Sequence, residues 1–204
     1  MDIGRAFNFV FQDPKWLTKV LIFAVLAFIP IFGWFVNFGY ALRIIKNVVE
    51  GNDVPLPEWD GFGLMFADGL RAFFVAIVWL IPAIILAFLF NLGDSFILTL
   101  LARIILAVAT AFVLAAIVPV ALTGVIAEGL NFQVIINRVM SNLGDYIIIL
   151  AVGLIVTVIS SFGLIGACLG FLISLFYAWL VQSHLAAQAY VRSTGGQIPP
   201  KQAF

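Results

Sequence analysis

The sequence has few charged residues, one cysteine and one histidine. Only 10% of its 204 residues are Asp, Glu, Lys or Arg, and ten basic residues balance ten acidic ones. Soluble domains carry about 25% charged residues, and nucleic-acid-binding proteins carry a basic excess, so the composition argues against both classes. The lone cysteine, Cys168, excludes an internal disulfide and a cluster of thiolate ligands.

Apolar residues make up most of the chain instead. Ala, Val, Ile, Leu, Met, Phe, Trp, Tyr and Cys account for 64% of it, and Phe alone occupies 21 positions. A compact soluble domain of this size could not bury so much apolar surface. The apolar runs are continuous, whereas the strands of a membrane barrel alternate. We therefore expect an all-α integral membrane protein with a single membrane domain over residues 1–204.

Three long apolar blocks each contain helix-breaking residues near their middle. A membrane span needs about 20 apolar residues, and each block is too long for one span. The breaks fall at residues 30–33, 91–95 and 160–163. The pattern predicts six transmembrane helices in three helical hairpins, at about residues 14–50, 70–122 and 144–190. The alternative is five spans, in which one Pro-kinked helix covers residues 16–46.

Basic residues lie almost entirely on one side of the six-span arrangement. Both termini and both long connections share that side, which holds nine of the ten Lys and Arg residues. Because Lys and Arg near span ends gather on the cytoplasmic face, we expect both termini to be cytoplasmic. The expected location is the cytoplasmic (inner) membrane of a prokaryote, and no cleavable signal peptide is apparent.

A segment too polar to span a membrane precedes each hairpin. These segments cover about residues 4–15, 58–69 and 128–142, and they mix aromatic residues with charged or amide side chains. Such amphipathic stretches lie in the headgroup plane. We expect them to set the depth of the spans; a contact surface for lipid or a partner is the alternative.

Polar residues recur on one face of the second helix in the first and third hairpins. The two sets are related by a constant offset of 137 residues, which suggests an internal repeat whose middle hairpin has diverged. Polar groups in a bilayer need partners, so we expect both stripes to face the bundle interior or another protein. Their members are Asn37, Tyr40, Asn47, Ser174, Tyr177 and Gln188, with His184 on the same face.

Small residues indicate where helices pack closely. Gly166 and Gly170 form a small-x-x-x-small pair, and Ala107, Ala111 and Ala115 repeat every four residues. Both patterns let helix backbones approach one another. The glycine pair is equally compatible with packing inside the bundle and against a second subunit.

The single histidine, His184, lies near the cytoplasmic end of the last predicted span. It is either an interior histidine with hydrogen-bond partners or an axial ligand to a haem- or chlorophyll-type macrocycle. One histidine cannot supply both axial ligands from this chain. We expect no bound cofactor, with the macrocycle as the alternative.

Charged residues provide two further candidate sites. Arg103 is expected to reach the outer surface and pair with Asp94; the alternative is an anion or a partner's acid inside the bundle. Four cations are expected at the cytoplasmic headgroup level, where they set topology or bind anionic lipid. These four are Arg43, Lys46, Arg71 and Arg138.

Five short motifs in the first third of the chain resemble a known family. They are Asp13-Pro14-Lys15-Trp16, Pro30-Ile31-Phe32-Gly33-Trp34, Gly39-Tyr40-Ala41-Leu42-Arg43, Leu56-Pro57-Glu58-Trp59-Asp60 and Asp68-Gly69-Leu70. Together they resemble the prokaryotic multi-pass membrane proteins of domain of unknown function 4013. The resemblance is weaker but continuous to the end of the chain. It implies a membrane protein and transfers no catalytic residue, because the family has no established activity.

The sequence contains no recognisable enzyme motif. It lacks HExxH, GxSxG and Walker patterns, and its acidic residues lie outside the predicted spans or at their edges. We expect a non-enzymatic structural or accessory subunit that binds membrane lipid, other membrane proteins or itself, and no nucleic acid. One alternative is a small-solute or lipid transporter or channel that follows the polar stripes. Another is a pigment-binding subunit of an electron-transfer or photosynthetic complex.

Overall fold

The computed structural model describes residues 1–54, 56–93, 95–162 and 167–195, and every regular element in these ranges is helical. The prediction of an all-helical protein is confirmed. In chain order the elements are α1 Ile3–Asn8, the 3-10 helix η1 Phe9–Gln12, α2 Trp16–Ala27, α3 Phe32–Val49, α4 Phe62–Asn91, α5 Phe96–Thr123, α6 Ile126–Gly129, α7 Phe132–Ser141, α8 Leu143–Phe162 and α9 Ala167–Thr194.

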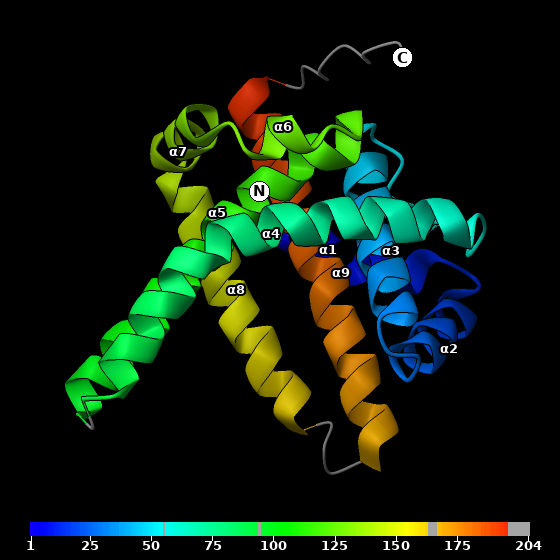
Figure 1. Cartoon of the computed structure of the whole chain (residues 1–204). Coiled ribbons are helices and arrows are strands. Elements are labelled where there is room, and N and C mark those ends of the chain that lie inside the picture. The colour runs from blue at the N-terminus through cyan, green and yellow to red at the C-terminus, as the bar shows by residue number, and fades with distance from the viewer. Residues whose placement is uncertain (55, 94, 163–166, 196–204) are drawn as a thin grey trace.

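The long helices form pairs that run in opposite directions. In α2–α3, α4–α5 and α8–α9, the second helix returns toward the end of the molecule where α6 and α7 lie (Figure 1). Among the described residues, three helices are long and apolar enough to cross a membrane, and a fourth candidate results if the bent pair α7–α8 is counted as one. The three are α4, α5 and residues 170–194 of α9. Helices with the length and composition of membrane spans are therefore present, but the predicted count of six is not confirmed.

The first hairpin is where the structure differs from six spans. α2 has 12 residues, or about 18 Å of helix at 1.5 Å per residue, which is short of the ~30 Å hydrocarbon core. The chain still folds back here: Asn37 Nδ2 lies 3.4 Å from the Phe23 carbonyl oxygen, and Trp34 Nε1 donates to the Ala27 carbonyl at 3.1 Å. Both contacts join antiparallel helices, so the alternative of one kinked helix over residues 16–46 is wrong.

Local sequence explains where the helices end and bend. Pro30 has no N–H for a helical hydrogen bond, and α2 ends just before it. Gly124 follows α5 with a φ of +73°, a left-handed conformation that ends helices and favours glycine. α4 contains Pro82 and changes direction along its length, so its first half lies across α3 and its second half runs beside α5 (Figure 1).

Two glycines let α3 and α4 cross with their backbones in contact. A Cβ on Gly39 would lie 1.9 Å from the Met65 carbonyl oxygen, and one on Gly69 would lie 1.8 Å from the Phe35 carbonyl oxygen. No residue with a side chain fits either position without displacing a helix. This crossing fixes α4 over α3 and leaves the α3–α4 loop, residues 50–61, next to the N-terminal segment.

The predicted membrane-surface segments take different forms. Residues 4–15 contain α1 and η1. Residues 58–69 are partly loop and partly the first turns of α4, which continue without a break into the apolar part of that helix. Residues 128–142 contain α7, which meets α8 at an angle of 85°.

Candidate functional site

A buried carboxylate from the α3–α4 loop lies at the centre of a polar network. Asp53 is 5% exposed. Arg5 donates to its two oxygens through Nε at 2.7 Å and Nη2 at 2.5 Å, and His184 Nε2 lies 3.0 Å from Oδ2. One acid therefore joins α1, the α3–α4 loop and α9.

Gln188 determines which nitrogen of His184 carries the proton. Gln188 Oε1 accepts from the Asp2 backbone N–H at 2.6 Å, which turns its amide nitrogen toward the Asp2 carbonyl and His184 Nδ1, both at 2.9 Å. An amide nitrogen can only donate, so Nδ1 accepts and Nε2–H donates to Asp53. The neutral ring uses both nitrogens within the chain, and a macrocycle metal would have to displace Gln188 or Asp53.

The charges around Asp53 keep it ionised. Burial alone would raise the pKa of Asp53, but hydrogen bonds from Arg5 and His184, together with the Arg5 charge, lower it below its usual range. The same hydrogen bond and charge raise the pKa of Arg5. The Arg5–Asp53 ion pair is therefore fixed over the range in which proteins normally work.

A cavity of about 370 Å³ adjoins this network. The cavity is lined by residues from the N-terminus, the end of α3, the α3–α4 loop and the end of α9. These residues are Met1, Asp2, Arg5, Val48, Gly51, Asp53, His184, Gln188, Val191 and Arg192. Two of its cations already have acid partners, because Arg5 pairs with Asp53 and Arg192 pairs with Asp145 at 2.7 Å.

A second buried ion pair ties the N-terminal segment to the same loop. Lys19 Nζ donates to Asp13 Oδ2 at 2.9 Å and to the Leu56 carbonyl at 2.5 Å. Asp13 also accepts from the backbone N–H groups of Lys15 and Leu56. The side chains of Asp13 and Lys19 are 1% and 3% exposed, and Glu58 lies 3.1 Å from Nζ.

These contacts more than offset the burial of Asp13. Burial alone would raise its pKa, but the hydrogen bonds from Lys19, Lys15 and Leu56 and the Lys19 charge lower it. The carboxylate acts as a fixed hydrogen-bond acceptor for the loop.

Aromatic residues cover the outer side of this ion pair. Tyr40 donates to the Pro57 carbonyl at 2.9 Å, its ring stacks on Trp59 at 4.0 Å, and Trp59 Nε1 donates to the Lys19 carbonyl at 3.0 Å. α3, the loop and α2 are thus held together by directional contacts.

The predicted polar stripe on α9 faces the N-terminal segment. Tyr177 donates to the Phe7 carbonyl at 2.8 Å, while His184 and Gln188 belong to the Asp53 network. Ser174 donates to the Gly170 carbonyl within its own helix. Within the described residues, no member of this stripe forms a hydrogen bond or an ion pair with the polar stripe on α3.

The stripe on α3 contacts α2 and the α3–α4 loop. Asn37 is buried against α2, and its Oδ1 has no hydrogen-bond partner among the described residues. Tyr40 reaches the loop, and Asn47 is half-buried with its carbonyl accepting from the Asn52 backbone N–H at 2.7 Å. Tyr40 and Tyr177, one from each stripe, are thus both engaged by other segments of the same chain.

The residues predicted to pack helices together have mixed surroundings. Ala111 and Ala115 are buried in the main core, whereas Ala107 is exposed. Gly170 is half-buried, and Gly166 lies outside the described residues. The crossing of α3 and α4 instead uses Gly39 and Gly69. Their sequence signal was visible, since each glycine lies in an otherwise bulky helical stretch.

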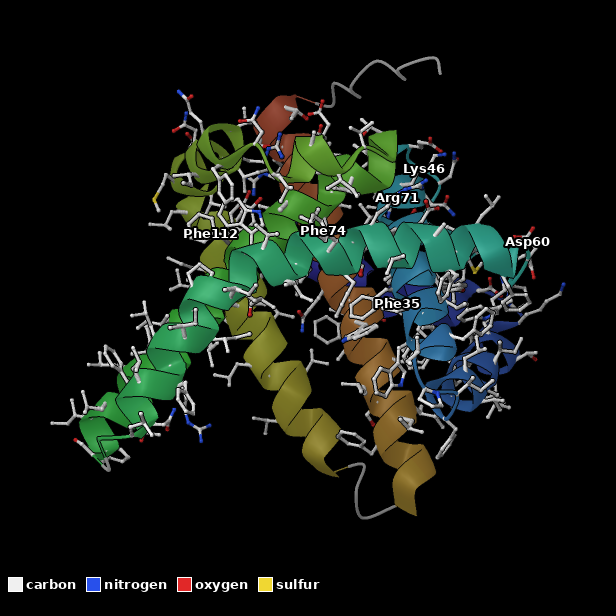
Figure 2. The ribbon with its side chains drawn as sticks, viewed as in Figure 1. Phe35, Lys46, Asp60, Arg71, Phe74 and Phe112 are labelled. Carbon is white, nitrogen blue, oxygen red and sulfur yellow. The ribbon has the colours of Figure 1, made fainter. Side chains whose placement is uncertain are left out.

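Three of the four cations predicted at the headgroup level have partners within the chain. Arg43 pairs with Asp60 and Arg71 with Asp68, both at 2.5 Å, and Arg138 lies over the Tyr190 ring at 4.6 Å. Lys46 forms no ion pair or side-chain hydrogen bond with the part of the chain that the structure describes. Lys46, Asp60 and Arg71 all lie toward one end of the molecule (Figure 2).

One predicted pair lies at the far end of the α4–α5 hairpin. Arg103 is exposed, and its predicted partner Asp94 lies outside the described residues.

The described residues offer no cluster of metal ligands. Within residues 1–54, 56–93, 95–162 and 167–195, no group of three or more His, Cys, Asp or Glu side chains could hold a metal ion.

Sequence reasoning missed the four charged residues at the centres of the two networks: Arg5, Asp13, Lys19 and Asp53. It placed the first three in a surface segment or at a span end. One signal was available: Lys19 lies within an apolar stretch, and a lysine there requires a counter-ion. Nothing local identified Asp53, because its partners are 48 and 131 residues away.

Comparison with known proteins gives a family but no activity. A family model described as protein of unknown function (DUF4013) matches residues 22–174, about three quarters of the chain. No curated protein matches the chain, and no solved structure does. The matched range includes Asp53 and the α3–α4 crossing, while Arg5, Asp13, Lys19 and His184 lie outside it.

Proposed function

The chain belongs to the family of proteins of unknown function DUF4013, and we propose that it is a non-enzymatic multi-pass membrane protein that serves as a structural or accessory subunit. Its location would be the cytoplasmic membrane of a prokaryote, with both termini on the cytoplasmic side. It would contact lipid and other membrane proteins through the apolar faces of α4 and α5.

One observation carries this proposal: the far half of the α4–α5 hairpin extends away from the other helices (Figure 1). Large apolar side chains are exposed on both of its helices. They include Ile84, Ile85, Phe88, Leu89, Phe96, Ile97, Leu100 and Leu101. Apolar surface costs about 25 cal/mol per Å² in water, so a contiguous exposed patch requires acyl chains or another apolar protein surface.

The two buried networks support a structural role over solute transport. Four polar side chains of α3 and α9 are engaged by the N-terminal segment and the α3–α4 loop of the same chain: Tyr40, Tyr177, His184 and Gln188. A transport path would need polar groups that face one another across a solute. The observed contacts favour a fixed scaffold.

Cysteine accessibility in intact cells tests the proposed membrane arrangement. In a Cys168→Ser background, Asn52→Cys and Gln133→Cys should react with a membrane-impermeant maleimide only after permeabilisation. Leu92→Cys, at the end of α4, should react in intact cells. The arrangement is overturned if Asn52 and Leu92 are labelled from the same side, or if alkaline carbonate extracts the chain from membranes.

Purification in a mild detergent tests the accessory role separately. We expect the full chain to migrate with a second protein or as a homo-oligomer. A monodisperse monomer, found under conditions that preserve known membrane complexes of the same host, would overturn that part of the proposal.

A further inference from the structure

A polar cavity and an apolar cavity lie next to each other in the crevice between α3, α4 and α5. The polar cavity has a volume of about 410 Å³, and its lining includes Arg43, Lys46, Asp68 and Thr123. The apolar cavity has a volume of about 140 Å³, and its lining includes Phe38, Ala72, Ala76, Leu114 and Trp179. α3, α4 and α5 line both cavities, and α9 also lines the apolar one through Trp179, Gln182 and Ser183.

The register along each helix places one cavity directly beyond the other. On α3, Leu42 lines both cavities, and Lys46 follows it by one turn. On α4, Asp68 lines the polar cavity and Ala72, four residues later, the apolar one. Residues four apart lie on one face of a helix, about 6 Å along its axis.

The lining residues of α5 follow the same order along the helix, from the apolar cavity to the polar one. Leu114 and Ile117 line the apolar cavity, and Val120, Ala121 and Thr123 line the polar one. On each of these three helices the lining thus changes from apolar to polar between one cavity and the other. That profile matches an amphiphile whose charged group lies at the helix ends and whose chain extends inward.

The charge around the polar cavity leaves one cation in excess. Arg43 is neutralised by Asp60 and Arg71 by Asp68, whereas Lys46 has no ion-pair partner within the described part of the chain. Arg43 and Arg71 retain further N–H donors, since a guanidinium carries five. A single negative charge would therefore be matched by Lys46 and hydrogen-bonded by donors already held in place.

We propose that this crevice binds one anionic phospholipid, with its headgroup phosphate at Lys46 and Arg43 and part of one acyl chain in the apolar cavity. The inference rests on the proposed membrane location and adds to it a defined binding site. The small side chains of Ala72 and Ala76 leave the space that the acyl chain occupies.

Lipid binding to the purified full chain tests the headgroup half of the site. In a non-ionic detergent, phosphatidylglycerol should raise the unfolding temperature and give a one-lipid adduct by native mass spectrometry, while phosphatidylcholine should do neither at equal concentration. Lys46→Gln should weaken the binding about fivefold, the effect of one basic residue at a lipid surface. Lys15→Gln is the control, because Lys15 is 71% exposed at the side-chain level and lies outside the crevice.

A cavity-filling variant tests the acyl-chain half and identifies the source of the anion. Ala76→Leu should weaken phosphatidylglycerol binding and leave the lipid-free unfolding temperature nearly unchanged. If Ala76→Leu does not fold, Ala41→Leu is tested in its place, because it fills the same cavity from α3. Inorganic phosphate should neither stabilise the protein nor compete with the lipid. Effective competition by phosphate would reduce the site to an anion site and overturn the acyl-chain assignment.

Two results would overturn the proposed lipid-binding site but would leave the proposed membrane location unaffected. One is equal loss of lipid binding in Lys46→Gln and Lys15→Gln, which would indicate a diffuse surface charge. The other is unchanged lipid binding in both cavity-filling variants. Failure of the proposed function would be seen separately, in the cysteine-accessibility and carbonate-extraction experiments.

Discussion

Replacing Asp13 with Asn would leave the Lys19 ammonium buried without its carboxylate. Both side chains are almost fully buried, and among the described residues the other acceptors of Lys19 Nζ are the Leu56 carbonyl and Glu58. Removing one partner of a buried ion pair costs about 3–5 kcal/mol. Glu58 is 60% exposed and remains near the ammonium, so we expect a loss at the lower end, about 3 kcal/mol.

The measurement is the free energy of unfolding of the full chain in detergent. Asp60→Asn is the matched control, because Asp60 also pairs with a cation but is 75% exposed. Exposed pairs contribute about 0–1 kcal/mol, so this acid-to-amide change should cost no more than that. Adding Lys19→Met to Asp13→Asn should recover much of the loss, because the unpaired charge is removed along with the pair.

A loss for Asp13→Asn no larger than that for Asp60→Asn would refute the reasoning. It would mean that water reaches Lys19 and that the α3–α4 loop does not cover the ion pair. Failure of the double variant to recover stability would instead show that the Asp13 carboxylate acts mainly through the backbone N–H groups of Lys15 and Leu56.

Three further predictions use the same unfolding measurement. Gly39→Ala should cost about 3 kcal/mol, because its Cβ would overlap a carbonyl of α4, whereas Gly63→Ala, whose Cβ would meet nothing within 4 Å, should change stability by less than about 1 kcal/mol. Because the folded-state pKa of Asp13 is lowered, the contribution of its carboxylate to the free energy of unfolding is complete above about pH 4 and is lost as the pH falls below that value. The difference in unfolding free energy between the unmodified chain and Asp13→Asn should therefore be equal at pH 7 and 5 and should shrink toward pH 3. Tyr177→Phe should cost about 0.5–1.5 kcal/mol and speed amide exchange in residues 3–12, and unchanged exchange there would contradict the docking of the N-terminal segment.

The helical class and the hairpin pairing could be predicted from the sequence because both depend on local features. A run of apolar residues too long for one span predicted the hairpin that α4 and α5 form, and the helix-breaking residues 30–33 predicted a turn between α2 and α3. Span length failed at α2, since the hairpin predicted at about 14–50 includes residues that form turns on both sides of that helix. The hydropathy of residues 14–30 does not reveal that Asp13 and Lys19 form a buried pair there.

The candidate site could be predicted only in part, because it is assembled from distant segments. The predicted polar stripe includes Tyr177, His184 and Gln188, whose side chains contact the N-terminal segment and Asp53. Of these partners, Arg5 and Phe7 lie in a segment predicted at the membrane surface, whereas Asp53 lies in the connection between the first two hairpins, where nothing in the sequence indicated a site. A short amphipathic segment looks the same in sequence whether its apolar side contacts lipid or packs on another helix.

The internal repeat accounts for the partners of the two stripes. Tyr40 and Tyr177 are equivalent under the offset of 137 residues, and each donates a hydrogen bond to a backbone carbonyl in a segment that precedes a hairpin: Tyr40 to Pro57 and Tyr177 to Phe7. Each also contacts an aromatic ring of the segment that it holds, Trp59 and Phe7 respectively.

The middle hairpin, which has no equivalent tyrosine, holds the third segment differently. Trp79 of α4 donates to the Gly129 carbonyl at 2.9 Å, and its ring packs on Phe132 at the start of α7. Every hairpin thus holds one of the short segments by an aromatic donor bound to a backbone carbonyl. If the repeat suggested by the sequence is real, we expect its unit to be a helical hairpin together with such an aromatic donor, which is a tyrosine on α3 and α9 and a tryptophan on α4.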